Sequence, residues 1–155
     1  RDPEIADVAA HHRVPIIAMH WDTGRDTARD LIDEMKRWLS RSVDIALKAG
    51  IARDAIILDP GFGFAKSFAE NYELLNRLDE LHALGFPLLV GTSRKRMIGN
   101  LLDVPPKERV SGTIATSVLG YLKGGHIFRV HDVRANRDAL RVAAATLYGP
   151  PQLEG

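Results

Sequence analysis

The sequence predicts an α/β protein with a parallel β-sheet, because four short apolar runs alternate with longer segments of helical spacing. The runs are rich in branched aliphatic side chains, which is typical of strands covered on both faces. Repeated alternation of strand and helix indicates right-handed crossovers. Two architectures satisfy this pattern: an open doubly wound sheet, or part of a (β/α)8 barrel.

The residues at the element ends justify each element in turn. The expected strands cover residues 15–19, 55–58, 87–90 and 127–130. The expected helices cover residues 4–12, 28–46, 67–81, 112–122 and 136–148. Ser67 and Glu70 form a capping box, while Gly50 and Gly85 follow the last turns of two helices. We expect one domain over residues 1–149 and a flexible tail over residues 150–155.

Composition narrows the class of protein. The chain has 155 residues, 45% of them apolar, with 21 basic against 20 acidic residues and no cysteine. The apolar content favours a packed core over disorder. The near-neutral charge creates no broad electrostatic field that would attract nucleic acid. The absence of cysteine excludes disulfides and cysteine metal sites. No apolar run approaches the roughly 20 residues of a membrane span, and the opening does not resemble an export leader, so we expect a cytoplasmic protein. Because the chain opens without Met, we expect part of a longer protein to precede Arg1.

Polar residues and glycines lie at the ends of the predicted strands rather than at their starts. They are His20, which follows Met19, and Asp59, Gly91, Ser93, Lys95, Arg129, His131 and Asp132. Because the carboxyl ends of parallel strands converge in both architectures, we expect these residues to meet in one active site.

Strand alternation places Arg129 and His131 on one face and Phe128 and Val130 on the other. An arginine in an apolar strand is costly unless an anion or a carboxylate compensates it. A guanidinium fork beside an imidazole suits a phosphate or pyrophosphate. The alternative is an internal ion pair of Arg129 with Asp59 or Asp132; we favour the anion.

Asp59 precedes a tight loop that contains Pro60 and two glycines. Its carboxylate can accept two parallel N–H bonds from a planar amidine-like edge, as on a 2-aminopyrimidinone ring. Phe62 and Phe64 can supply flat apolar walls. The structural alternative is that Asp59 caps the following turn and that both phenylalanines belong to the core.

Residues 93–96 form a charged loop after Gly91. The simplest interpretation is a solvated basic turn, and a nucleic-acid patch lacks a further basic stripe. Lys95 can donate to a ring carbonyl or nitrogen, Ser93 can sit close to a ligand, and the helical stretch that begins here favours a carboxylate. His20 is expected to be packed rather than catalytic.

Segments 59–64, 91–95 and 129–133, together with Met19 and His20, resemble the dihydropteroate synthase family, the sulfonamide targets of folate biosynthesis. The resemblance spans nearly the whole chain. It implies the carboxyl-terminal half of a TIM (β/α)8 barrel, strands five to eight, over residues 1–149. It also implies a transferase that condenses 6-hydroxymethyl-7,8-dihydropterin diphosphate with p-aminobenzoate, giving 7,8-dihydropteroate and pyrophosphate.

The resemblance assigns roles to individual residues. The pterin-binding residues it implies are Met19, Asp59, Phe64, Gly91 and Lys95. It places Phe62, Ser93 and Arg96 near p-aminobenzoate, and Arg129 and His131 on the diphosphate. Lys95, Arg129 and His131 are the expected catalytic residues.

The family pattern also raises expectations beyond these residues. Mg2+ is expected to assist departure of the diphosphate, with no metal ligand in this half of the barrel. The metal ligand, further pterin-binding residues and two mobile loops belong to the amino-terminal half. The isolated chain is therefore expected to contain only part of the active site. Arg96 departs from the family's serine, which leaves its contact with the aminobenzoate carboxylate open. A homodimer and inhibition by sulfonamides are further expectations.

Two alternatives remain beside a synthase. One is a pterin-dependent methyltransferase, although a methyl donor has no diphosphate for Arg129 and His131 to bind. The other is a non-catalytic paralogue, or a half-barrel that binds pterin without turnover.

Overall fold

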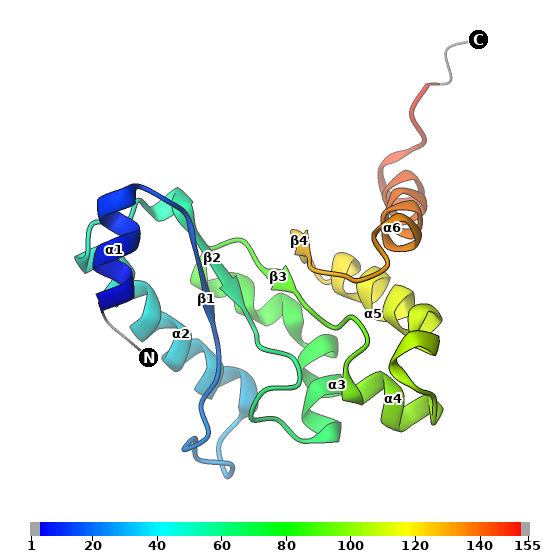
Figure 1. The fold of residues 1–155 in the computed structure, drawn as a ribbon, viewed down its shortest axis with the longest axis horizontal. Coiled ribbons are helices and arrows are strands. Elements are labelled where there is room, and N and C mark those ends of the chain that lie inside the picture. Colours follow the sequence, from blue (N-terminus) through cyan, green and yellow to red (C-terminus); the bar gives the residue numbers. More distant parts are fainter. Residues whose placement is uncertain (1–3, 153–155) are drawn as a thin grey trace.

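The computed structural model describes residues 4–152. Within that range lie the parallel strands β1 (Ile16–Met19), β2 (Ile56–Asp59), β3 (Leu89–Val90) and β4 (Ile127–Phe128). β1 pairs with β2, β3 pairs with β4, and a parallel bridge between Leu58 and Leu88 joins the two pairs. Spatial order therefore follows chain order (Figure 1). A doubly wound sheet reverses its strand order at a switch point, so the described strands favour a barrel segment.

Helices follow the strands in alternation, as the sequence predicts. They are α1 (Glu4–His12), α2 (Leu31–Lys48), α3 (Phe68–Asn76), α4 (Arg96–Leu102), α5 (Val110–Leu122) and α6 (Val133–Tyr148), with 3₁₀ turns η1 (Arg53–Ala55), η2 (Leu78–Leu84) and η3 (Pro106–Glu108). The predicted capping box is confirmed, because Ser67 accepts from the Glu70 N–H and Glu70 accepts from the Ser67 N–H. No helix among the described residues combines the length and apolar character that crossing a bilayer requires.

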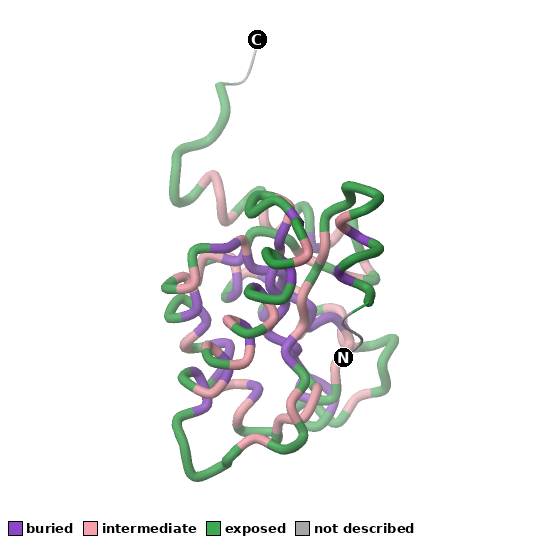
Figure 2. Tube along the Cα trace, turned by 90° about the vertical axis from the view of Figure 1, so that its left-hand side faces the viewer, coloured by how far each residue is buried: buried purple, intermediate pink, exposed green. Residues whose placement is uncertain are grey.

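The core lies between one face of the strands and the helices packed on that face. Ile56 and Leu58 of β2 are fully buried, as are Leu39 of α2, Leu74 of α3 and Leu81 of η2. Figure 2 shows the buried segments inside the fold and the exposed loops around them. Burial of these aliphatic side chains is the main favourable term for the stability of this fold.

The opposite face of the outer strands is open. Ile17 of β1 is 54% exposed and Ile127 of β4 is 38% exposed. The expectation that every strand is covered on both faces is therefore wrong for β1 and β4. In a closed barrel, side chains from the other strands fill this face.

Several element boundaries differ from those predicted. β3 and β4 have two residues each instead of the expected four, and α2 begins at Leu31 instead of residue 28. The helix expected to run through Leu81 ends at Asn76, and the chain continues as η2 after Arg77, whose φ of −108° leaves the helical range. α5 begins at Val110 and α6 at Val133, each earlier than expected. Residues 150–152 are irregular, while 1–3 and 153–155 lie outside the described residues, including part of the expected tail and the chain's opening.

Candidate active site

Asp59 is the buried carboxylate at the end of β2, with 5% of its surface exposed. Its Oδ1 accepts the N–H of Gly61 at 2.8 Å. Gly61 has a φ of +71°, and a Cβ there would overlap the carbonyl oxygen of His20. Only glycine fits this loop, because both the backbone angle and the close approach exclude a side chain. The loop that follows Asp59 therefore packs directly against the backbone at the end of β1.

Burial raises the pKa of Asp59, although the Gly61 N–H and the charges of Arg129, Lys95 and Lys66 oppose that shift. The carboxylate is poorly solvated and surrounded by cations. Such a group gains from any partner that offers two N–H donors, because the donors replace lost water. This is the character expected of a carboxylate that binds an amidine-like edge.

Arg129 follows β4 and faces Asp59, with Nη2 3.8 Å from Oδ2. Gly91 makes room for it, because a Cβ at Gly91 would lie 3.2 Å from the same Nη2. The Arg129 side chain is 64% exposed, so solvent screens this long ion pair and leaves the guanidinium accessible. The alternative pairing with Asp132 is not found; Asp132 instead pairs with Arg94. The ion pair with Asp59, one of the two alternatives, is therefore present, and binding of an anion by the accessible guanidinium stays a prediction.

Lys95 lies at the amino end of α4 with its Nζ 4.1 Å from the centre of the Phe64 ring. Trp21 contacts the same ring, at 5.3 Å between centroids. Burial and the charge of Arg129 lower the pKa of Lys95, while Asp59 raises it. Phe64 therefore forms an apolar wall beside a cation and a buried carboxylate, as the sequence predicts for a ring-binding slot.

Ser93 and His131 are in direct contact. Ser93 Oγ lies 2.9 Å from Nδ1 of His131, and the His131 N–H donates to the same Oγ at 3.1 Å. β4 ends at Phe128, so the expected strand alternation does not reach His131. The imidazole of His131 is therefore held near the end of β4 by hydrogen bonds to Ser93, in the loop after β3, and not by strand geometry.

The loop after β3 is built into the structure and is not a solvated turn. Arg94 donates from Nη2 and Nε to the carboxylate of Asp132, at 2.9 and 3.2 Å. Its backbone N–H donates to Thr113, and its carbonyl accepts from Arg109 at 2.9 Å. Arg94 also adopts a φ of +57°. This network fixes the backbone that carries Ser93 and Lys95.

The structure places the remaining predicted residues differently. Met19 lies opposite Asp59 in the β1–β2 register and is partly buried. Phe62 is 1% exposed within the core, which favours the structural alternative for this residue. Arg96 is exposed on the first turn of α4, away from the buried pairs described above. The aminobenzoate roles of Phe62, Ser93 and Arg96 stay predictions.

Sequence reasoning missed two basic residues that hold the site loops. Lys66 contacts His20 and the loop after β2, and Arg109 donates to carbonyl groups of the loop after β3. Lys66 could have been noticed from its position directly after the loop that follows β2. Its partner His20 comes from the preceding βα unit, and the carbonyl partners of Arg109 lie 14 and 15 positions earlier in the chain, so no local pattern reveals these contacts. His20 is fully buried, as predicted, and its Nε2 has no hydrogen-bond partner among the described residues.

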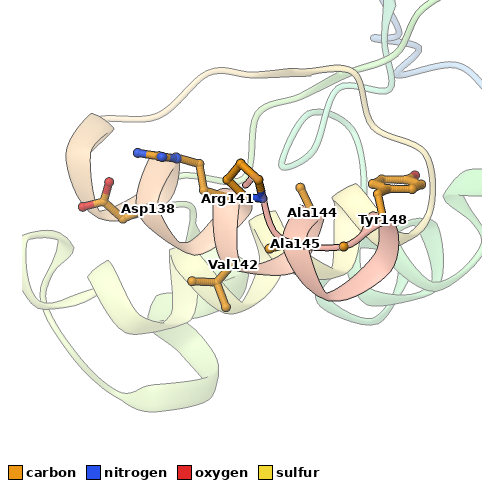
Figure 3. Close-up of a pocket in the computed structure, with 8 residues that line it drawn as sticks. Asp138, Arg141, Val142, Ala144, Ala145 and Tyr148 are labelled. Atoms are coloured by element: carbon orange, nitrogen blue, oxygen red, sulfur yellow. The ribbon is translucent and has the colours of Figure 1, made fainter. Parts of the chain in front are cut away.

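Two other kinds of site are possible among the described residues: a cluster of metal ligands and a surface hollow. Within residues 4–152, no three histidine or carboxylate side chains are grouped to hold a metal ion. A hollow beside α6, lined by Asp138, Arg141 and Tyr148 among others, contains none of the strand-end residues (Figure 3). We therefore place the candidate site at the open carboxyl ends of the strands.

Comparison with known proteins identifies the family. Residues 1–131 match the model of the family described as pterin binding enzyme. The dihydropteroate synthase of Bacillus subtilis is 50% identical over 133 residues, which cover 86% of this chain and 46% of that protein. The Escherichia coli K12 dihydropteroate synthase is 43% identical, covering 94% of this chain and 54% of that protein. The chain thus spans about half the length of these relatives.

Comparison with solved structures finds the same family as the sequence comparisons. A Yersinia pestis dihydropteroate synthase in a sulfonamide drug complex matches with a TM-score of 0.89 and 39% identity, over 95% of this chain and 56% of that one. The Xanthomonas albilineans dihydropteroate synthase in complex with 7,8-dihydropteroate matches with a TM-score of 0.90 and 41% identity, over 97% of this chain and 57% of that one. Together with the strand-end site, these matches show that the chain belongs to the pterin-binding enzyme family.

Proposed function

We propose that the protein carrying this chain is a dihydropteroate synthase, and that the chain is the carboxyl-terminal half of its TIM barrel. The reaction condenses 6-hydroxymethyl-7,8-dihydropterin diphosphate with p-aminobenzoate and releases pyrophosphate. One observation carries the proposal: buried Asp59, Lys95 and accessible Arg129 lie around the same strand ends. The 50% identity to the Bacillus subtilis synthase supports it.

In this proposal Asp59 binds the amino-pyrimidine edge of the pterin. Its carboxylate accepts two parallel N–H bonds, while Lys95 donates to the ring carbonyl or nitrogen. Phe64 and Met19 line the flat faces of the slot, and Gly91 leaves space for the ring and for Arg129. The neutral apolar walls and the buried carboxylate together select a planar heterocycle with an amidine edge.

Arg129 and His131 bind the diphosphate of the same substrate. As the C–O bond to the diphosphate breaks, negative charge accumulates on the leaving group, and a fixed guanidinium stabilises it more than it stabilises the ground state. The uncharged amine of p-aminobenzoate then forms the new C–N bond and loses a proton. Ser93, Arg96 and Phe62 are the residues that we propose beside p-aminobenzoate.

Further features of the whole enzyme follow as proposals. The sulfonamide complex of the Yersinia pestis relative supports sulfonamides as inhibitors here. We propose a cytoplasmic homodimer, supported by exposed apolar side chains on α5 and α6, among them Leu122 and Val142. Mg2+ on the substrate diphosphate is part of the same proposal.

The decisive experiment is incorporation of labelled p-aminobenzoate. The protein carrying this chain should form labelled dihydropteroate from pterin diphosphate and release pyrophosphate in equal amount. The 155-residue chain alone should give no detectable product, since it contributes half of the site. Pterin binding without product by the longer protein would favour the non-catalytic paralogue, and methyl transfer to an acceptor would favour the methyltransferase.

A further inference from the structure

Lys66 joins the ends of two neighbouring strands. It lies between β2 and α3, and its Nζ is 2.9 Å from Nδ1 of His20, at the end of β1. The same Nζ donates to the carbonyl oxygens of Gly61 and Phe64, both at 3.1 Å. An ammonium group has three protons, and these contacts use all of them. We call Lys66, His20, Gly61 and Phe64 the loop clamp.

The hydrogen bonds of Lys66 determine the tautomer of His20. An ammonium group only donates, so Nδ1 of His20 must accept and Nε2 must carry the ring proton. Burial, reinforced by the charge of Lys66, lowers the pKa of His20 to about 4. Burial lowers the pKa of Lys66 to about 8, with Arg25 and Lys95 lowering it further and Asp59 and Glu70 opposing. Near neutral pH the clamp is therefore a charged lysine on a neutral histidine.

The clamp acts on two groups of the candidate pterin slot. The Phe64 carbonyl is tied to Lys66, and the Phe64 ring is the surface over which Lys95 lies. Asp59 is held from two sides, because the Gly61 N–H donates to its carboxylate and the His20 N–H donates to its carbonyl at 2.9 Å. Lys66 binds both of these neighbours of Asp59. One ammonium group thus links the neighbours of the carboxylate to the backbone of the Phe64 wall.

Other hydrogen bonds and an ion pair, none of which involves Lys66, hold the rest of the loop after β2. The role of the loop clamp can therefore be separated from the folding of the loop. The Gly63 N–H donates to the side chain of Asn71 at 2.6 Å, and Asn71 donates to the Ser67 carbonyl at 2.7 Å. Arg25 pairs with Glu70 at the start of α3. Loss of the Lys66 ammonium leaves these contacts in place, so the loop should keep its fold while the Asp59–Phe64 spacing relaxes.

We propose that Lys66 is a positioning residue for pterin recognition, which sets the Asp59 carboxylate against the Phe64 wall by clamping the loop after β2 to His20. This rests on the proposed function, in which Asp59 and Phe64 bind the pterin ring. Arg129 and His131 lie on other strand ends, outside the clamp. Lys66 should therefore affect binding of the ring and leave binding of the diphosphate unchanged.

The test compares two ligands in the protein carrying this chain. Lys66→Met should weaken binding of 6-hydroxymethylpterin by about tenfold or more, in calorimetric titrations at pH 7, and change pyrophosphate affinity by less than about twofold. Lys107→Met, at an exposed position of η3, is the matched control and should change neither. Circular dichroism and thermal unfolding check that the variants remain folded.

Chemical rescue distinguishes the ammonium from side-chain bulk. Because residues 1–155 contain no cysteine, Lys66→Cys introduces a single thiol into this segment. Alkylation with 2-bromoethylamine under mildly denaturing conditions, followed by refolding, rebuilds an ammonium at nearly the length of lysine. Pterin affinity should recover after this alkylation and should not recover after alkylation with iodoacetamide. Equal recovery with both reagents would overturn the proposal.

A spectroscopic readout works without substrate turnover. The 15N shifts of His20 should show an unprotonated Nδ1 at pH 7 in the wild type and a changed Nδ1 signal in Lys66→Met. Wild-type pterin affinity in a folded Lys66→Met protein, or an unchanged His20 spectrum, would contradict the clamp. Failure of the wild type to bind pterin, with the His20 change present, would instead contradict the proposed function and leave the loop clamp as a structural device.

Discussion

Ser93 and His131 are joined by two hydrogen bonds, one to the backbone and one to the ring of the histidine. The His131 backbone N–H can only donate, so Ser93 Oγ accepts it at 3.1 Å. The Ser93 hydroxyl is then free to donate to Nδ1 of His131, 2.9 Å away. When the hydroxyl donates to Nδ1, the ring proton lies on Nε2, where it can donate to an anion; in the other tautomer Nδ1–H donates to Oγ. In both tautomers Ser93 holds the orientation of the imidazole that we propose for diphosphate binding.

Ser93→Ala should weaken pyrophosphate binding. Without the hydroxyl, His131 loses the partner that holds its ring orientation, so we expect a loss of about three- to tenfold in a calorimetric titration. Ser111→Ala, at an exposed position of α5, is the control. Equal affinities in wild type and Ser93→Ala would show that Ser93 does not act through His131.

Asp59→Asn should separate stability from binding. Burial holds the pKa of Asp59 above its ordinary value of 3.8, so the folded state disfavours the ionised carboxylate. A raised acid pKa means that ionisation costs stability at neutral pH, and that this cost fades as the pH falls through the folded pKa. Asparagine can still accept the Gly61 N–H. We expect an unfolding free energy at pH 7 no lower than in the wild type.

Urea unfolding measures that free energy, and the same preparations report pterin affinity. Wild-type affinity for 6-hydroxymethylpterin should fall as the pH drops through the raised pKa, whereas the weak affinity of Asp59→Asn should show no such step. A variant that unfolds readily and binds as tightly as the wild type would make Asp59 a structural residue.

Gly61→Ala should destabilise the protein far more than an equivalent change at another positive-φ glycine. Gly61 combines a φ of +71° with its close approach to the His20 carbonyl oxygen. Gly50 has a φ of +93°, and a Cβ added there would meet nothing within 4 Å, so Gly50→Ala tests the backbone angle alone. We expect about 1–2 kcal/mol for Gly50→Ala and at least about 2 kcal/mol more for Gly61→Ala, measured by urea unfolding. Similar losses at both positions would mean that the loop yields to the added methyl.

Acid should destabilise the fold through His20. Its pKa falls from 6.5 to about 4 in the folded protein, because of burial and of the charges of Lys66 and Arg25, which Asp22 opposes. A base with a lowered folded pKa stabilises the fold fully above pH 6.5, and this contribution is lost as the pH falls toward 4. Relative to His20→Asn, the wild type should lose on the order of 3 kcal/mol over this window.

Unfolding free energies measured at several pH values test this prediction. The exposed His11 serves as the control, and His11→Asn should follow the wild-type curve. Parallel curves for wild type and His20→Asn would show that His20 is not held neutral by its surroundings.

Much of the fold was predictable, because local patterns determine it. Apolar runs located all four strands, and capping chemistry located the start of α3 at Ser67. The end of α3 was not predictable, because Arg77 bonds to Asp30, 47 positions earlier, as well as to its neighbours Glu73 and Glu80. That contact exists only once α2 lies beside α3.

The same division holds for the site. Asp59, Lys95 and Arg129 were predictable because parallel strand ends converge. The partners of Arg94 and Lys66 were not, since Asp132 and His20 come from other βα units. Phe62 shows the limit of loop chemistry as a guide: its place between two glycines indicated a ligand wall, yet its side chain points into the core, where burial is more favourable.

The central claim is that one pocket binds a ring through Asp59 and its phosphates through Arg129. Paired calorimetric titrations of 6-hydroxymethylpterin and of pyrophosphate test it most directly, with Arg134→Ala on α6 as an exposed control. Asp59→Asn should lose the pterin by about tenfold or more and keep pyrophosphate, and Arg129→Ala should lose pyrophosphate and keep the pterin. Wild-type affinities for both ligands in both variants would contradict the account.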